Sequence, residues 1–133
     1  MVESKVIWTD SDRFVGQALS GHEIVLDAGK EKTANSPVEL VLMALCGCTA
    51  ADVVSILRKK REPFTSVEVS AKGERAASPP TVYTEIKLIY RVGGKVSHKA
   101  VEDAVNLSET KYCSVAAMLG KTAKITYEIE YLG

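Results

Sequence analysis

Three cysteines and two histidines are the side chains in this sequence that are best suited to chemistry. A cysteine thiolate is a nucleophile and a metal ligand, and a histidine can carry protons near neutral pH. Cys46 and Cys48 are separated by one residue, whereas Cys113, His22 and His98 each stand alone. The chemistry open to this set is therefore nucleophilic or redox chemistry of sulfur, or metal binding.

The spacing of Cys46 and Cys48 argues against a metal site. Residues two apart on a helix point about 200° apart around its axis. The two thiols therefore do not readily bind one ion or bridge each other in a helix, and they differ from the C-x-x-C knuckles of zinc sites. The sequence also has no HExxH, EF-hand, P-loop or GxSxG motif. We predict no metal and no cofactor.

A simpler interpretation of the cysteines stays open at this point. Free cysteines are most often small buried hydrophobic residues, and spacing alone favours that interpretation for all three. Gly47 and the small residues after Cys48 would let a substrate approach the thiol, but a closely packed helix needs the same small residues. For His22 and His98, a turn and a helix start are the simpler explanations.

The cysteine pair lies in the longest apolar stretch of the chain, residues 36–61. Ser36 can cap a helix, Pro37 suits its first position, and Glu39 completes the spacing of a capping box. Four cations at 58–61 favour a helix C-terminus, and Pro63 prevents any continuation. We predict one long helix over this stretch.

The first half of this helix, residues 38–45, has almost no polar face. A helix that is apolar on all sides is buried, so we expect it to be wrapped by the rest of the fold or by a partner chain. Gly47, Thr49 and Asp52 interrupt the stretch, which makes it too short for a membrane span. We predict no membrane association.

The remaining elements are predicted from alternation and turn signals. Short strands are expected at 6–8, 14–19 and 22–27, and a polar loop at 27–35 leads to the helix. Residues 65–74 and 81–92 alternate with period two and predict a long antiparallel pair. In the second strand, we expect the residues with even numbers to share one face: Val82, Thr84, Ile86, Leu88 and Tyr90.

Two shorter helices and a last strand complete the chain. Ser97 is expected to cap a helix that ends near Ser108, and the segment 108–112 reads as a break. A helix over 113–119 is expected to end at Gly120 in the C′ position, before a strand over 123–132. The order βββ-α-ββ-αα-β predicts an α+β fold, with antiparallel sheets around a long buried central helix, in one domain spanning 1–133.

Composition limits the class of protein. The 17 basic and 17 acidic residues give a net charge of zero, which argues against a nucleic-acid-binding surface. The N-terminus MVESKVIWTD is too polar for a signal peptide, and an odd number of cysteines disfavours a disulfide framework. We expect a cytoplasmic protein.

Two motifs together resemble the OsmC/Ohr family of thiol-dependent organic hydroperoxide reductases. They are SPVELVLMALCGCTAADVV and, much later, KYCSVAAML, and with SGHEIVLDA they look most like the shorter OsmC-like branch. The resemblance covers nearly the whole chain. It implies an OsmC-like fold and an intertwined homodimer, in which central helices pack together and the active site lies at the subunit interface.

The resemblance also implies roles for two cysteines. The family's first cysteine stands eleven residues after the proline of the central-helix motif, a position that is Cys48 here. In the family this thiolate attacks an organic hydroperoxide and becomes a sulfenic acid. The second cysteine, Cys113 here, resolves it as a disulfide that a dithiol later reduces. Cys46 is then an additional structural thiol, and no metal, haem or flavin is needed.

This sequence departs from the family pattern at one supporting pair. The family places a glutamate directly after the proline, where it holds a catalytic arginine, but this position is Val38 here and Glu39 comes one residue later. Arg13, the only arginine before the helix, does not match the position of the family's arginine. A second interpretation is therefore a small-ligand-binding or redox-sensing protein on the same fold.

Overall fold

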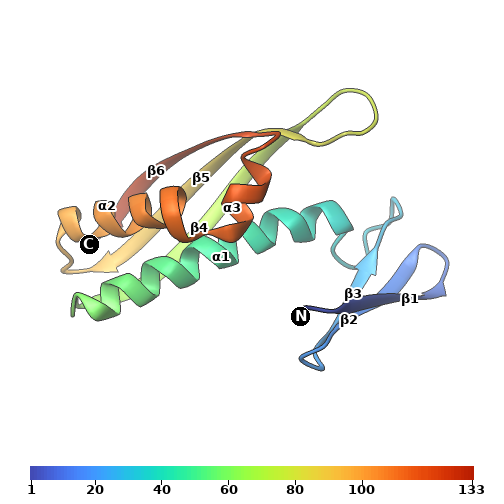
Figure 1. The fold of residues 1–133 in the computed structure, drawn as a ribbon, viewed down its shortest axis with the longest axis horizontal. Coiled ribbons are helices and arrows are strands. Elements are labelled where there is room, and N and C mark those ends of the chain that lie inside the picture. Colours follow the sequence, from blue (N-terminus) through green and yellow to red (C-terminus); the bar gives the residue numbers. More distant parts are fainter. The chain divides into compact units, whose positions relative to one another are not determined.

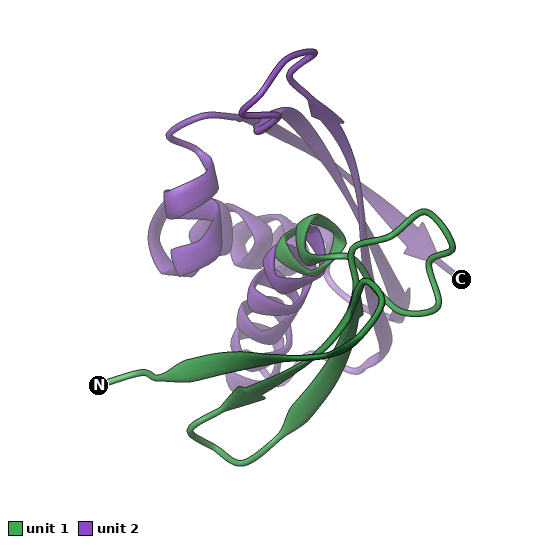
Figure 2. Ribbon diagram, turned by 90° about the vertical axis from the view of Figure 1, so that its right-hand side faces the viewer, with its two compact units in different colours: residues 1–41 green, residues 42–133 purple.

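Ten helices and strands follow one another in the computed structural model, which describes residues 1–133 (Figure 1). Residues 1–41 and 42–133 form two compact units, unit 1 and unit 2 (Figure 2). The prediction of a single domain over 1–133 stays a prediction. The elements are β1 Ser4–Asp10, β2 Arg13–Ala18, β3 Glu23–Asp27, α1 Pro37–Lys59, β4 Phe64–Arg75, β5 Tyr83–Gly94, α2 His98–Leu107, η1 Ser108–Tyr112, α3 Ser114–Leu119 and β6 Lys124–Leu132.

Unit 1 is a three-stranded antiparallel sheet in the order β1-β2-β3. Its three strands confirm those expected from the turn clusters. At the end of β3 the buried carboxylate of Asp27 accepts hydrogen bonds from the Thr33 side chain and from the backbone N–H groups of Gly29 and Thr33. These bonds lower the pKa of Asp27, and they fix the polar loop that precedes the helix.

Helix α1 begins as the sequence predicts. The backbone N–H of Ser36 donates to Glu39 Oε1 at 2.9 Å, and the backbone N–H of Glu39 donates to Ser36 Oγ at 3.2 Å. This is a complete capping box, which occupies two backbone donors that a helix start would otherwise leave free. The helix ends with Arg58 and Lys59 in its last turn.

Only one stripe of α1 is buried within the chain. Its fully covered residues recur every four positions: Leu45, Thr49, Val53 and Leu57. Other apolar positions stay open, with Val41 40% and Met43 49% exposed. By length and composition this helix could cross a membrane, a test that the core helix of a soluble protein also passes. The chain alone therefore does not provide the all-round burial that its sequence predicts.

Unit 2 is built on a second three-stranded sheet, ordered β4-β5-β6. Strands β4 and β5 form the predicted antiparallel pair, in which Ser70 faces Ile89. Strand β6 runs parallel to β5, so this sheet is mixed and the expectation of purely antiparallel sheets is wrong here. The reason is the connection from β5 to β6, which crosses over through α2, η1 and α3 and brings the chain back in the same direction.

The predicted face of β5 is confirmed along most of the strand and reversed at its start. Ile86, Leu88 and Tyr90 are buried as expected. Tyr83 is buried as well, whereas Val82 is 41% exposed. A register shift explains the reversal, because Glu74 pairs with Glu85 but Arg75 pairs with Tyr83. The extra residue in β5 inverts the alternation at this bulge.

The helices of unit 2 lie on one face of its sheet, where the core is found (Figure 2). Helix α2 is capped by Ser97, whose Oγ accepts from the backbone N–H of Ala100 at 3.2 Å, as predicted. Its covered side is made of small and branched residues: Ala100, Val101, Ala104 and Val105. A tyrosine from the middle strand, Tyr90, is the largest fully buried side chain.

The segment 108–112 is not the break that its sequence suggests. It forms the π-helical turn η1, which continues directly from α2 and ends where the backbone N–H of Cys113 donates to the Ser108 carbonyl. Helix α3 then ends at Gly120, as expected, but this glycine has right-handed φ and ψ. A Cβ atom there would lie 3.0 Å from the Ala116 carbonyl oxygen, a tight contact that glycine avoids.

Candidate active site

Two segments that are distant in sequence bring two of the three cysteines together. The sulfur atoms of Cys48 and Cys113 and a carboxylate oxygen of Asp52 all lie within 4.8 Å of one another. Cys48 and Asp52 share one face of α1, because residues four apart on a helix are neighbours. Cys113 reaches them from the junction between η1 and α3. The pair named by the sequence resemblance is thus adjacent in space, and Asp52 is a third member.

Cys46 is not part of this cluster. It is half-buried on α1, and burial raises the pKa of its thiol. Its separation from Cys48 around the helix axis is the one expected for a C-x-C spacing in a helix. A structural role for Cys46 stays a prediction.

The Cys113 thiol is held in its protonated form. Its sulfur is the N-terminal cap of α3 and accepts from the backbone N–H of Ala116 at 3.3 Å, a contact that favours the thiolate. The side chain is only 4% exposed, however, and this burial raises the pKa of Cys113 to about 12. Contact with Cys48 and the charge of Asp52 act in the same direction. Desolvation therefore outweighs the helix N-terminus at this cysteine.

A chain of three hydroxyl groups lies beside the cysteines and links two carboxyl groups. Ser108 Oγ donates to Asp52 Oδ2 at 2.9 Å, and it lies 2.7 Å from Thr49 Oγ1. Thr49 Oγ1 lies 2.7 Å from the Tyr90 hydroxyl, which bonds to Glu109 Oε1. The three hydroxyl residues are fully buried. The chain joins α1, β5 and η1, and so it fixes the elements that carry the cysteines.

Burial raises the pKa of both groups at the outer end of this chain. For Glu109 desolvation is the main cause, and the hydrogen bond with Tyr90 acts against it. For Tyr90 desolvation again comes first, and the bond to Glu109 raises the pKa further. Both shifts favour the neutral form of the group concerned.

The charged and aromatic candidates from the sequence lie elsewhere. Glu39 is used in the capping box, and Arg13 pairs with Asp10 at 2.6 Å within unit 1. His22 Nδ1 lies 3.2 Å from Ser20 Oγ in a turn, and the His98 ring stacks on Tyr131 with 3.6 Å between ring centroids. These contacts agree with the simpler explanations given above for both histidines.

Sequence reasoning missed the polar residues around the thiols. Asp52 and Thr49 looked like interruptions of an apolar helix, although the four-residue spacing of Asp52 from Cys48 was a usable signal. Ser108 and Glu109 lay in the supposed break. The cluster provides three donor groups that a metal could use, whereas a closed zinc site takes four. We assign no metal to it, and the expectation of no cofactor stays a prediction.

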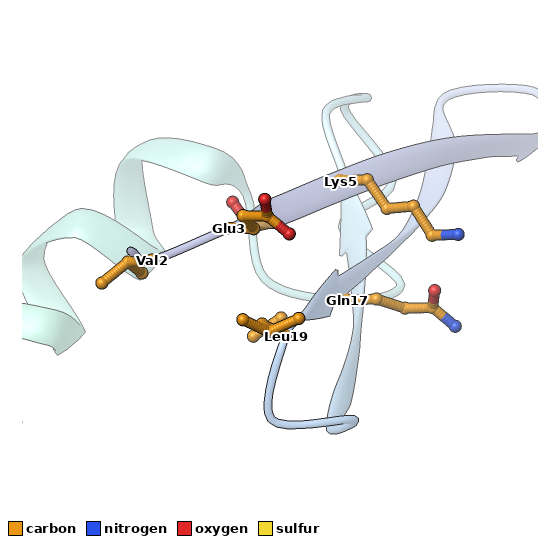
Figure 3. A pocket seen from close by; sticks show the side chains of 7 residues that line it. Val2, Glu3, Lys5, Gln17 and Leu19 are labelled. Atoms are coloured by element: carbon orange, nitrogen blue, oxygen red, sulfur yellow. The ribbon is translucent and has the colours of Figure 1, made fainter.

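A surface pocket in unit 1 lacks these chemical groups (Figure 3). Its labelled side chains are Val2, Glu3, Lys5, Gln17 and Leu19. No cysteine or histidine lines it. The candidate chemistry is therefore assigned to the thiol cluster of unit 2.

Comparison with known proteins identifies relatives along the whole chain. A family model described as OsmC-like protein matches residues 29–128. The protein YhfA of Escherichia coli K12 is 43% identical over 130 residues, which cover 97% of each chain. A hypothetical protein from Aquifex aeolicus VF5 has a similar structure, with a TM-score of 0.86 and 33% identity over 100% of this chain and 98% of that one.

A more distant structure comes from a protein whose activity is named. An organic hydroperoxide resistance protein OsmC from Legionella pneumophila, also described as a predicted redox protein, aligns with a TM-score of 0.73. The alignment covers 98% of this chain and 96% of that chain, at 13% identity. At this identity the likeness establishes a shared fold.

The first prediction concerns the buried hydroxyl chain. We expect Thr49→Val to lower the free energy of unfolding by about 2 kcal/mol, because the Tyr90 and Ser108 hydroxyls would each lose a buried partner. Urea unfolding would measure the loss. Thr126→Val, the same change at an exposed position of β6, should stay within about 0.5 kcal/mol of the parent protein. Equal losses of unfolding free energy in the two variants would contradict a stabilising role for the hydrogen bonds of Thr49.

The second prediction concerns alkaline stability. Since the folded protein keeps the Cys113 proton up to a pKa of about 12, whereas the ordinary value is 9.0, the unfolded chain ionises first. The contribution of the protonated Cys113 thiol to the free energy of unfolding is therefore fully present below pH 9. It is lost as the pH rises toward 12. In unfolding experiments on the reduced protein across that range, Cys113→Ala should lose less stability than the parent. An equal loss in both proteins would refute the raised pKa.

Proposed function

The chain belongs to the OsmC-like protein family, and we propose that it is a cysteine-based peroxidase that reduces organic hydroperoxides. The observation that carries this proposal is the approach of Cys48 and Cys113, whose sulfur atoms are within 4.8 Å although they are 65 positions apart in the sequence. Two thiols at this distance can form a disulfide after a small movement of their side chains. A peroxidase that resolves its own sulfenic acid requires such a pair.

The proposed reaction has three steps. The Cys48 thiolate attacks the O–O bond of the hydroperoxide, which leaves a Cys48 sulfenic acid and, after protonation of the leaving alkoxide, an alcohol. Cys113 then attacks the Cys48 sulfur, the S–O bond breaks, and a disulfide and water form. A dithiol reductant finally reduces the disulfide by two thiol–disulfide exchanges. The sulfur atoms of the two cysteines and of the dithiol supply all the electrons, so the reaction needs no other redox group.

Cys48 suits the attacking role and Cys113 the resolving role. Cys48 is half-buried, whereas Cys113 is buried and its pKa is raised to about 12. Because the thiolate is the reactive form, a thiol with such a pKa is a poor first nucleophile toward peroxide. It needs only to attack a neighbouring sulfur, where proximity compensates for the low thiolate fraction.

A second candidate function is a small-ligand-binding or redox-sensing protein. Val38 stands where the family has its glutamate, and the only arginine before α1 is engaged with Asp10. Without a cation to orient the peroxide, turnover could be slow enough for the disulfide to serve as a signal. Ligand binding that persists in the Cys48→Ser, Cys113→Ser double variant would favour this candidate.

We further propose a homodimer that is soluble and cytoplasmic. The support is the apolar surface that the chain leaves open on α1, where Val41 and Met43 are exposed. A patch of this kind on a soluble protein marks an interface. A second copy of α1 packed against this surface would complete the burial that the helix sequence predicts.

Replacement of the attacking thiol tests the proposed reaction. We expect Cys48→Ser to abolish consumption of cumene hydroperoxide in the presence of a dithiol, because serine is no nucleophile toward the O–O bond. Cys113→Ser should still form the sulfenic acid, which a dimedone adduct on Cys48 would reveal by peptide mapping. Cys46→Ser is the matched control and should keep full turnover. Undiminished turnover by Cys48→Ser would refute the peroxidase proposal.

A charge placed on the open face of α1 tests the dimer. We expect Met43→Glu to give the mass of one chain by analytical ultracentrifugation, whereas the parent has twice that mass, because burial of an unpaired carboxylate is too costly for the interface. Lys121→Glu introduces the same side chain in the exposed turn after α3 and should leave the dimer intact. A dimer that survives Met43→Glu would place the interface elsewhere.

A further inference from the structure

The proposed reaction leaves one proton without an assigned carrier. When Cys113 attacks the Cys48 sulfur, its thiol proton must leave, and the departing hydroxide must gain a proton to become water. Burial holds this thiol in its neutral form at neutral pH, so spontaneous ionisation is rare. A base beside Cys113 would remove that obstacle.

Asp52 is the acidic group placed to act as this base. A carboxylate oxygen of Asp52 lies within 4.8 Å of both sulfur atoms, a distance that one water molecule or a small rotation of the thiol would bridge. The carboxylate is half-buried, and it is held in place by the hydrogen bond that Ser108 donates at 2.9 Å. Catalytic hydrogen bonds are often long in resting structures and shorten in the reacting complex.

The hydroxyl chain needs one more proton than its three hydroxyl groups provide. Four contacts join Asp52, Ser108, Thr49, Tyr90 and Glu109 in a row. Three hydroxyl groups have three protons, and two ionised carboxylates have none. If both carboxylates were ionised, one contact would bring two buried oxygen atoms together without a proton between them. Four hydrogen bonds therefore require one of the two carboxyl groups to be protonated.

The surroundings of the two carboxyl groups decide which one holds this proton. Burial raises the pKa of Glu109, which favours its neutral form. With the proton on Glu109, this carboxyl group donates to the Tyr90 hydroxyl across their short contact. Each hydroxyl then donates to the next group in the direction of Asp52, and the last of these bonds joins Ser108 to Asp52 at 2.9 Å. Asp52 is then ionised and able to accept a proton.

We propose that Asp52 is the general base of the resolving step, kept ionised by a hydroxyl chain whose one shared proton resides on Glu109. Asp52 takes the proton from the Cys113 thiol as the S–S bond forms, and gives it to the hydroxide that leaves Cys48, so that one disulfide and one water result. The inference rests on the proposed function only in that Cys113 resolves an oxidised Cys48.

A reaction without peroxide tests this base. In a Cys46→Ser background, dithiobis(nitrobenzoate) would first attach one nitrothiobenzoate to Cys48, and attack by Cys113 would then release the second one as a coloured anion. This leaving group needs no proton, so the rate of the second release reports removal of the Cys113 proton. The assay remains valid if Cys48 proves unreactive toward hydroperoxides, so the two proposals can fail separately.

The variant Asp52→Asn shows whether Asp52 removes the proton of Cys113 or acts on this thiol only through its negative charge. Asparagine can still accept the hydrogen bond from Ser108, which preserves the fold around the thiols. Loss of a general base should slow the second release at least about tenfold. Loss of a negative charge alone should speed it up, because the charge of Asp52 raises the pKa of Cys113. Asp103→Asn, at a surface ion pair of α2, should not change the rate. A rate for Asp52→Asn equal to or faster than the parent rate would overturn the proposal.

Infrared spectroscopy tests where the shared proton resides. We expect the parent protein at neutral pH to show the carbonyl band of a protonated carboxyl group, and Glu109→Gln to lack it. Absence of the band in the parent would refute the count of protons. Loss of the band in Asp52→Asn instead of Glu109→Gln would put the proton on Asp52, and would exclude that residue as the base.

Discussion

The hydroxyl group of Thr49 is the contact on which the arrangement of unit 2 depends most directly. It lies 2.7 Å from both Tyr90 and Ser108, and all three residues are fully buried. Polar groups in such a place are costly unless each has a partner, so the three elements that supply them can adopt few other alignments. The alignment that satisfies them also brings Cys113 next to Cys48. The same hydrogen bonds that specify the packing of α1, β5 and η1 therefore create the candidate site.

The π-helical turn η1 has a physical role in this arrangement. In a π-helix each backbone hydrogen bond spans five residues, instead of the four of an α-helix. Such turns are often found at functional sites. Here Ser108 and Glu109, consecutive residues of η1, reach the two ends of the hydroxyl chain, with Ser108 at Asp52 and Glu109 at Tyr90. The turn then ends at Cys113, whose sulfur caps α3. One short segment thus positions Cys113 and supplies two of the polar residues near it, Ser108 and Glu109.

Much of the fold could be predicted from the sequence, because its signals are local. The Ser36 and Glu39 capping box, the Ser97 cap and the alternation in 65–74 and 81–92 all act within a few residues. The structure confirms them, except at the bulge at the start of β5. The parallel pairing of β6 with β5 depends on how a long crossover packs, which no local pattern records. The site was predictable only in its cysteines, through a family resemblance. The roles of Thr49, Asp52 and Tyr90 could not be predicted from the sequence. They depend on hydrogen bonds between residues that are 41 to 59 positions apart.

In the proposed reaction, reduction of the disulfide between Cys48 and Cys113 also depends on the transfer of a proton. A reductant reaches the half-buried Cys48 more easily than the buried Cys113, and its attack on Cys48 expels Cys113 as the leaving group. A thiol with a pKa of about 12 leaves slowly as a thiolate, because exchange is faster when the leaving thiol is more acidic. Under the proposal made above, Asp52 would take the proton of the attacking reductant thiol and pass it to Cys113 as the S–S bond breaks. The same carboxyl group would therefore carry a proton both when the disulfide closes and when a dithiol opens it.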